Sequence, residues 1–476
     1  MSSGVAFSDL SVWPVILLMG VILGGLLLGN ALKRAVPFLR KSLIPVSVLG
    51  GGVLLIISTI CKLITGKYFF NYFLFGNGTN LTGIEIMEIM TYHCLAIGFI
   101  AMTLRRTGQG EKGKGKVKDV VNSGILTVSS YLLQGIVGLI VTFTASIFIP
   151  KILKAAGMLL AFGFGQGTGQ ALNYGSIYET NFGFEGGKSF GLTIAALGFL
   201  AASIGGIIYL AYHKKKGDII IRAEDKSKAE KVEEEGEIPM VESMDKLTVQ
   251  IALVVICYAL AYGIMFILGN LVGDGLKSTI FGFNFLIGTL AALIVKTGLN
   301  LLKKVKCMHR EYINNFLLSR IAGFAFDIMI VAGIGAIQID LIKDYLFIIL
   351  IMAVLGVVFT FLYVKFASKT LFGAYCHEEF LVMFGMLTGT ASTGVILLRE
   401  IDPMFETPAS DNVVYQTFPA ILLGFPMMLL AAFCPKSDVS TWITLGVLVG
   451  YFVVLNIVLF RSKIFKKRTP KEAEKE

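Results

Sequence analysis

The stretch of sequence that decides the fold is Gly163-Phe164-Gly165-Gln166-Gly167-Thr168-Gly169-Gln170. Its four glycines stand at alternate positions, and each costs a helix roughly 1 kcal/mol relative to alanine. The segment around it, residues 155–179, is otherwise apolar enough to enter a membrane. Backbone groups that lose their helical partners cost several kcal/mol each in the bilayer unless protein or a water-filled cavity satisfies them. We therefore expect a broken helix that is buried in protein or lines a cavity.

A second interrupted segment, residues 378–401, occupies the corresponding place in the other half of the chain. It contains Thr388-Gly389-Thr390-Ala391-Ser392-Thr393-Gly394. Each half has four apolar spans, then the broken segment, then a further span. Paired interrupted segments in repeated halves are the best sequence pointer to a transporter's binding site.

The composition is that of a polytopic membrane protein. Apolar types make up 55% of the 476 residues, charged types only 16%, and the mean hydropathy is +0.76. Soluble domains carry roughly 25% charged residues, so a soluble enzyme, a disordered chain and a secreted disulfide scaffold are excluded. The net charge of +10 comes from basic residues that flank apolar spans, which indicates membrane topology rather than nucleic-acid binding.

Eleven spans are expected from the apolar runs. They cover residues 12–31, 43–64, 85–104, 121–149, 189–212, 247–272, 279–297, 313–339, 346–367, 413–433 and 440–460. The predicted units are a first membrane repeat (1–212), a charged cytoplasmic linker (213–246), a second repeat (247–439), and an extra span with a basic cytoplasmic tail (440–476).

The positive charges favour an inverted repeat. If both broken segments return to the side from which they entered, each half has five crossings and the two halves face opposite ways. With the N-terminus outside and the C-terminus in the cytoplasm, most lysines and arginines then lie on the cytoplasmic side. The expected fold is an all-α polytopic membrane protein with two inverted-topology repeats of five spans, each with a re-entrant or broken helix, plus one extra C-terminal span. A full crossing by both broken segments is the alternative.

The two interrupted segments supply the candidate binding residues. Bare N–H groups can hold a carboxylate, bare carbonyls can hold Na⁺, and hydroxyl and amide side chains add further ligands. Close helix packing through small residues is the competing interpretation. The candidates are Gly165, Gln166, Gly167, Thr168, Gly169, Gln170, Asn173, Thr388, Gly389, Thr390, Ser392 and Thr393.

Asp327 is a further candidate, because a charge in mid-membrane costs roughly 2.5–3.5 kcal/mol on the mildest scale and usually has a function. Two interpretations stay open: Asp327 binds a coupling cation such as Na⁺, together with Thr390, or it forms a structural ion pair with Arg320, two turns earlier.

Other polar residues are interpreted as structural. Gln134 is expected to make a hydrogen bond between helices. Glu85 and Glu88 are expected on a solvated outer helix end, and His377-Glu378-Glu379 at a solvated helix start. The four histidines and six cysteines show no metal-binding or redox spacing.

The sequence resembles the bacterial sodium/glutamate symporter family. The resemblance is carried by Phe38-Leu39-Arg40-Lys41 through Ile44-Pro45, Gly50-Gly51-Gly52, Gly165-Gln166-Gly167-Thr168-Gly169, Asn181-Phe182-Gly183-Phe184, and residues 388–394 followed by Met404-Phe405. The order of spans agrees over about residues 10–435.

This resemblance implies Na⁺-coupled uptake of glutamate across the bacterial inner membrane. It implies re-entrant loops from opposite faces and an elevator-like movement of a loop-bearing core against a scaffold in a homodimer. The chain departs from the family at Gln166, where the family has histidine, and at Ser392, in a loop without the family's glycine-rich run and proline. We therefore expect glutamate or a related small organic anion as substrate, Na⁺ as coupling ion and no cofactor.

Rival functions use the same residues. A cation channel could use the Gly-Phe-Gly loop as a carbonyl filter, but such filters need fourfold repetition. A Na⁺/H⁺ antiporter could use Asp327. A membrane enzyme lacks a nucleophile–base or metal constellation.

Overall fold

The computed structural model describes residues 12–76, 81–105, 114–220, 222, 244–308, 310–403 and 407–464. All regular secondary structure within these ranges is helical. They include eleven helical stretches that are long and apolar enough to cross a membrane, which identifies a multi-pass membrane protein. The helices in these stretches are α1 (Pro14–Ala35), α3 (Val46–Thr65), α4 (Gly83–Leu104), α5 (Lys114–Phe148), α8 (Gly187–Lys216), α9 (Lys246–Val272), α11 (Asn284–Lys304), α12 (Asn315–Gly335), α14 (Leu346–Leu371), α18 (Thr417–Phe433) and α19 (Asp438–Leu459).

The expected spans and the observed helices correspond one to one, with shifts at their ends. Helix α8 continues through Lys216, because the basic side chains of its last turn suit the negative end of the helix dipole. The span expected at 279–297 begins later, at Asn284, because a separate helix α10 (Asp274–Gly282) precedes it. Most of the predicted linker, the predicted tail from residue 465, and Met404-Phe405 lie outside the described residues.

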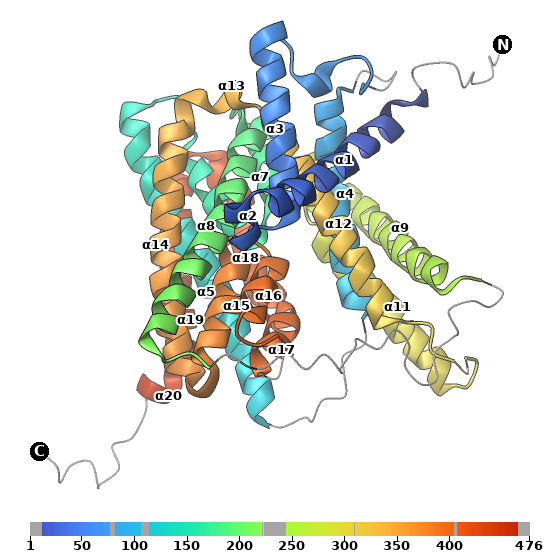
Figure 1. Cartoon of the computed structure of the whole chain (residues 1–476), viewed down its shortest axis with the longest axis vertical. Helices are drawn as coiled ribbons and strands as arrows, with labels where there is room; N and C mark the ends of the chain where they lie inside the picture. The colour runs from blue at the N-terminus through green and yellow to red at the C-terminus, as the bar shows by residue number, and fades with distance from the viewer. Residues whose placement is uncertain are drawn as a thin grey trace, which may run out of the picture.

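Six long helices form one group, which we call the frame: α1, α3, α4, α9, α11 and α12. Within it α12 packs against α3 and α4, and α11 packs against α4 and α9. The frame has a hydrophobic cluster of its own, built from Ile100, Ala101, Leu104, Val254, Cys257, Ala292, Ile313, Leu318 and Ala322. Figure 1 shows α9, α11 and α12 on one side of the molecule, away from α14 and α19.

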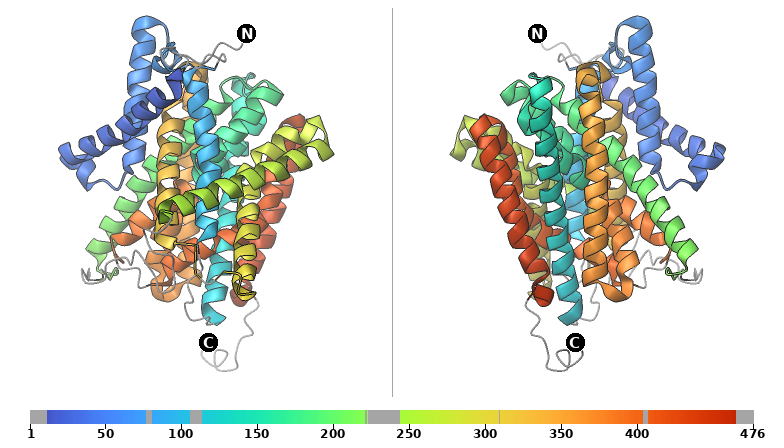
Figure 2. Two further views of the ribbon diagram at one scale, coloured as in Figure 1. Left: turned by 90° about the vertical axis from the view of Figure 1, so that its right-hand side faces the viewer. Right: turned by 90° about the vertical axis from the view of Figure 1, so that its left-hand side faces the viewer.

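Most of the remaining helices form a second group, which we call the bundle, whereas α2 (Pro37–Lys41) packs against α1 and α10 packs mainly against α9. Long helices α19, α5 and α14 run side by side in the right-hand view of Figure 2; α5 packs against both α14 and α19, and α8 packs against α14. They surround α6 (Leu159–Gln166), α7 (Thr168–Phe182), α15 (Cys376–Thr388) and α16 (Ala391–Arg399). Helix α17 (Pro408–Tyr415) and helix α18 close the bundle near α15, α16 and α5.

Both expected interruptions are present. Gly167 separates α6 from α7 with φ +80° and ψ −171°, a conformation that is essentially open only to glycine. Gly389 and Thr390 separate α15 from α16. The alternating glycines therefore mark a real break in the first segment.

Each broken segment folds back on itself. The Tyr345 ring is 5.5 Å from that of Phe184, just after α7, and the Tyr345 hydroxyl is 3.5 Å from the carbonyl of Lys151, just before α6. Arg222 plays the same part for the second segment: its guanidinium binds Glu378, near the start of α15, and its N–H donates to Ile401, just after α16. We call these units the first hairpin (residues 154–182) and the second hairpin (residues 376–399).

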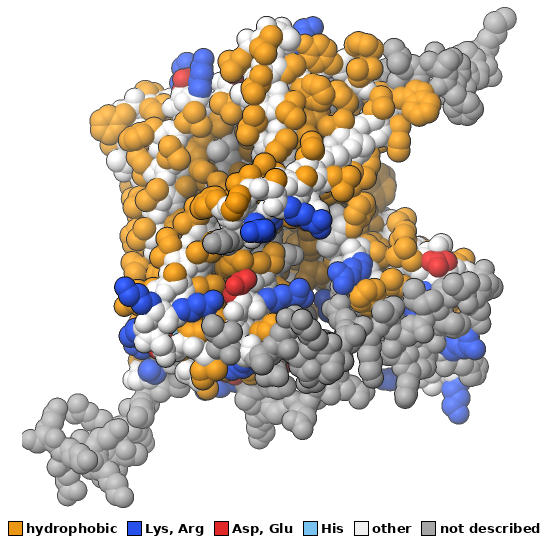
Figure 3. Space-filling model, in the orientation of Figure 1, with side chains coloured by type: hydrophobic (Ala, Val, Ile, Leu, Met, Phe, Trp, Pro, Cys, Tyr) orange, Lys and Arg blue, Asp and Glu red, His pale blue; other side chains and the backbone are white. Residues whose placement is uncertain are grey.

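The two hairpins are rooted at opposite ends of the molecule. We call the end with Tyr345 and α13 (Ile339–Ile342) the upper face, and the end with Arg222 and the last turn of α8 the lower face (Figure 1). Figure 3 shows an upper part that is largely apolar and Lys and Arg side chains that gather mainly over the lower part.

The root of the first hairpin depends on a contact between glycines. A Cβ at Gly138 in α5 would overlap the carbonyl oxygen of Gly157, which leads into α6. Replacing Gly138 by alanine should therefore lower the melting temperature of the purified protein by several degrees, because overpacking against backbone costs about 1–3 kcal/mol. The matched control is Gly20→Ala in α1, where a Cβ meets no atom within 4 Å. An unchanged melting temperature for Gly138→Ala would contradict this packing.

Candidate functional site

The breaks of the two hairpins lie next to each other. A Cβ at Gly167 would lie 3.6 Å from Cγ2 of Thr390 and 3.7 Å from the carbonyl oxygen of Gly389. Two interruptions far apart in the sequence thus meet inside the helix assembly. Gly198 of α8 lies beside them, because a Cβ there would overlap the carbonyl oxygen of Thr388.

A cavity of about 810 Å³ opens beside the hairpin breaks, between the bundle and frame helices α4 and α12. The candidate residues that line it are Gly165, Gln166, Gln170, Gly389, Thr390 and Ser392. The first hairpin and the second both contribute, so one space is bordered by both interruptions. This volume lies within the ordinary range for small-molecule sites, roughly 300–1,000 Å³.

The other candidates in the hairpins lie outside the cavity wall. Thr168 is fully buried, with its hydroxyl 3.5 Å from the carbonyl of Met329 in α12. Asn173 donates to the carbonyl of Gly282 at 2.6 Å. Thr388 donates to Phe384 in its own helix. These side chains satisfy backbone carbonyls, and Gly167, Gly169 and Thr393 likewise do not line the cavity.

The helix ends at the breaks set the local electrostatics. Helix α7 begins at Thr168 without a side-chain cap among the described residues, whereas the Thr390 hydroxyl caps α16 by accepting from the Thr393 N–H. The N-termini of α7 and α16 and the C-termini of α6 and α15 meet here. N-termini attract anions and C-termini attract cations, so both kinds of ion find a favourable dipole.

Charged residues in the cavity wall were missed by the sequence analysis. Arg105 and Arg399 were interpreted only as topology-setting charges, and Arg320 only as a partner for Asp327, yet all three line the cavity. The Arg320 guanidinium lies over the ring of Phe316, 4.8 Å from its centroid. Asp411 also lines the cavity. The polar wall thus has more positive than negative side chains.

Asp327 is not brought to this site. It lies on the exposed side of α12, where Ser47 of α3 hydrogen-bonds its carboxylate, and it does not line the cavity. A joint Na⁺ site with Thr390 therefore has no geometric support. The cost of a mid-membrane carboxylate is offset in part by the Ser47 hydroxyl.

Two buried side chains tie the second hairpin to the bundle. Gln134 of α5 donates to the Leu387 carbonyl at 2.8 Å and to the Thr360 hydroxyl at 3.0 Å, which confirms its expected interhelical role. The prediction that Glu379 is solvated is wrong. Glu379 is fully buried and accepts from Ser123 at 2.6 Å and from Asn412 at 2.9 Å, so it holds the hairpin base against α5 and α17.

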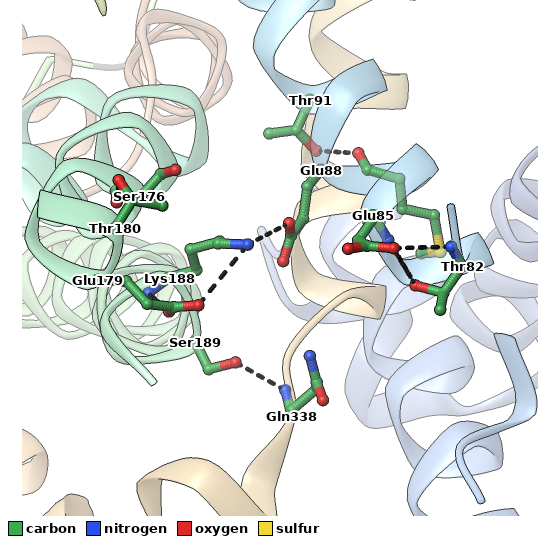
Figure 4. Close-up of polar contacts among 11 residues, drawn as sticks. Thr82, Glu85, Glu88, Thr91, Ser176, Glu179, Thr180, Lys188, Ser189 and Gln338 are labelled. Carbon is green, nitrogen blue, oxygen red and sulfur yellow. Dashed lines mark hydrogen bonds and ion pairs between the residues drawn. The ribbon is translucent and has the colours of Figure 1, made fainter. Parts of the chain in front are cut away.

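Glu88 also differs from its prediction. Instead of facing solvent, it forms an ion pair with Lys188 at 2.8 Å, and the two side chains are only 12% and 22% exposed. Figure 4 shows Lys188 of α8 between Glu88 of frame helix α4 and Glu179 of α7, whose carboxylate lies 3.7 Å away. Glu85 caps α4 together with Thr82. We call Glu88, Lys188 and Glu179 the upper latch, because it joins frame to bundle at the upper face.

Gly167 offers a direct test of the site. Gly167→Ala should weaken ligand binding at the cavity by at least tenfold, because alanine at φ +80° costs about 1–3 kcal/mol of strain and shifts the hairpin break. Gly66→Ala is the matched control: it also has positive φ, at 77°, but lies at the end of α3. Binding measured by calorimetry should be retained in that control. Equal losses in both variants would show that the break has no special part in binding.

Comparisons with known proteins add no assignment to this geometry. No protein-family model matches the chain, and no curated protein matches it. Function is therefore inferred from the cavity, the two helix breaks and the charges that face them.

Proposed function

We propose that this protein is a secondary active transporter that carries glutamate or a related small organic anion into the cell, driven by Na⁺. The observation that carries the proposal is the meeting of two interrupted helices, Gly167 against Gly389-Thr390, at the wall of one cavity. Non-helical backbone at membrane depth is tolerated only where it is buried or lines such a space. In secondary transporters, substrate and ion sites lie at such interruptions.

The charges of the cavity favour an anion. A carboxylate would accept hydrogen bonds from N–H groups of the first turn of α16, where Ala391 and Ser392 line the cavity, and from the Ser392 hydroxyl, with the cavity arginines supplying positive charge. Asp411 in the same wall offers a partner for the amino group of an amino acid. These features together support an acidic amino acid over a simple inorganic anion.

The coupling ion would use backbone oxygen rather than Asp327. Carbonyls at the C-terminal ends of α6 and α15 lie at the breaks, and Na⁺ is a hard cation that prefers oxygen ligands. Thr390 keeps its proposed part as a hydroxyl ligand at this point. A Na⁺/H⁺ antiporter built on Asp327 loses its support, because that carboxylate lies away from the cavity wall.

The membrane arrangement follows from the basic lower face. We propose that this face is cytoplasmic, that the N-terminus is outside, and that the chain has two inverted repeats of five spans with one extra span, α19. Each hairpin then re-enters the membrane from its own side. The protein would reside in a bacterial inner membrane, and the resemblance to the sodium/glutamate symporters adds a homodimeric scaffold.

Alternating access would move the bundle against the frame. The frame has its own hydrophobic cluster, and the upper latch bridges the two groups on the face opposite the basic one. With the latch formed and the cavity reaching Arg105 and Arg399, the structure corresponds to an inward-facing state in this proposal. Breaking the latch would let the bundle carry the site towards the upper face.

Transport in proteoliposomes tests the function. Radiolabelled glutamate should accumulate under an inward Na⁺ gradient and stop accumulating when the gradient is dissipated. Ser392→Ala should reduce kcat/KM by about tenfold or more, since a hydrogen bond to a charged group contributes about 1.5–3 kcal/mol. Ser146→Ala in α5, whose hydroxyl donates to Phe143, is the matched control and should transport normally. Uptake that is indifferent to the Na⁺ gradient for every acidic amino acid would refute the proposal.

The upper latch gives a second test. Lys188→Gln should shift the protein away from the inward-facing state, so that a cysteine placed at Ser392 reacts several-fold more slowly with a membrane-impermeant maleimide from the lower side. Lys154→Gln is the control, because Lys154 pairs with Asp438 at 2.6 Å entirely within the bundle. If both variants label at the same rate as the parent, the latch does not hold this state.

A further inference from the structure

Three possible metal ligands meet at the lower face, outside the cavity. His213 lies in the last turn of α8, Asp218 follows that helix, and His377 lies in the first turn of α15. One ligand atom from each lies within 4.8 Å of the others. The proposed transport chemistry uses none of these side chains.

Tyr209 orients the His377 ring, and the His213 ring already contacts the Asp218 carboxylate. The His213 Nδ1 is 2.8 Å from Oδ1 of Asp218, and the His377 Nδ1 is 2.8 Å from the Tyr209 hydroxyl. The ring centroids of the two histidines are 4.7 Å apart. Histidines that bind metals usually have such a partner on the ring, which fixes orientation and tautomer.

The Asp218 carboxylate lies between Lys216 and His213. Lys216 pairs with Oδ2 at 3.1 Å, which leaves Oδ1 on the His213 side. A deprotonated oxygen is what metal binding requires.

We propose that His213, His377 and Asp218 bind one divalent transition-metal ion, with Zn²⁺ as the best fit. Two imidazoles and one carboxylate are a common ligand set for Zn²⁺, and water supplies the fourth position. The ion ties the lower end of α8 to the base of the second hairpin, beside the Arg222–Glu378 ion pair at 2.6 Å. It thereby fixes the root from which the hairpin reaches the cavity.

Metal content and affinity test this site in the purified full-length protein. After treatment with EDTA and re-exposure to Zn²⁺, mass spectrometry should find one tightly held zinc per chain. His213→Gln and His377→Gln should each weaken Zn²⁺ binding by more than about tenfold in calorimetric titration. His93→Gln is the matched control, because His93 lies in α4 against the Tyr258 hydroxyl and should leave zinc binding unchanged.

Asp218→Asn is a second variant, to be used if a histidine variant fails to fold. Asp218 lies on the surface beyond the end of α8, so its replacement should not disturb folding. It should weaken zinc binding while the elution profile and melting temperature without metal stay unchanged. Zinc that persists undiminished in the His213→Gln/His377→Gln double variant, or that the parent never binds, would overturn the proposal. Neither result bears on glutamate uptake, so the metal site and the transport function fail separately.

Discussion

The whole arrangement depends on satisfying backbone groups at two helix breaks within an apolar assembly. At Gly167 and at Gly389-Thr390 the helical hydrogen bonds are interrupted, and the core of the bilayer contains no water to replace them. The chain answers by placing the breaks against each other and against a cavity. Gln134 supplies a side-chain donor to the Leu387 carbonyl, one of the last carbonyls of α15. Glycines at closely approached positions let α8 and α5 come near enough to enclose the hairpins.

The sequence predicted the spans and the breaks because both are local properties. A long apolar run specifies a membrane-spanning helix, and closely spaced glycines indicate where a helix is interrupted. It could not predict which polar side chains of a hairpin face the cavity. Gln166 and Ser392 do, but Thr168 and Asn173 turn towards carbonyls of Met329 and Gly282, which lie in helices that no sequence pattern pairs with them.

Charged residues were harder to interpret for a similar reason. Lysines and arginines near span ends follow topology, so Arg399 carried no separate signal even though it lines the cavity. Glu379 has the sequence context of a polar helix start, and only Ser123 and Asn412, from distant segments, make its burial tolerable. The opposite holds for Asp327. Its position in the middle of a span predicted a function, yet the fold places it at the surface of the frame beside Ser47.

In the alternating-access cycle that we propose, the upper latch would open at low cost. Lys188 contacts Glu88 across the boundary between frame and bundle, but it also has Glu179 as a neighbour within the bundle, 3.7 Å away. A buried charge that loses its only partner costs several kcal/mol. When the frame partner leaves, Lys188 keeps an opposite charge and its N–H still donates to Glu179 at 3.1 Å. On the frame side, Glu88 loses its contact with Lys188, and its side chain near the upper face would gain water as the groups separate. In that cycle, a lysine with one permanent and one exchangeable partner would stabilise one state without making it too stable to leave.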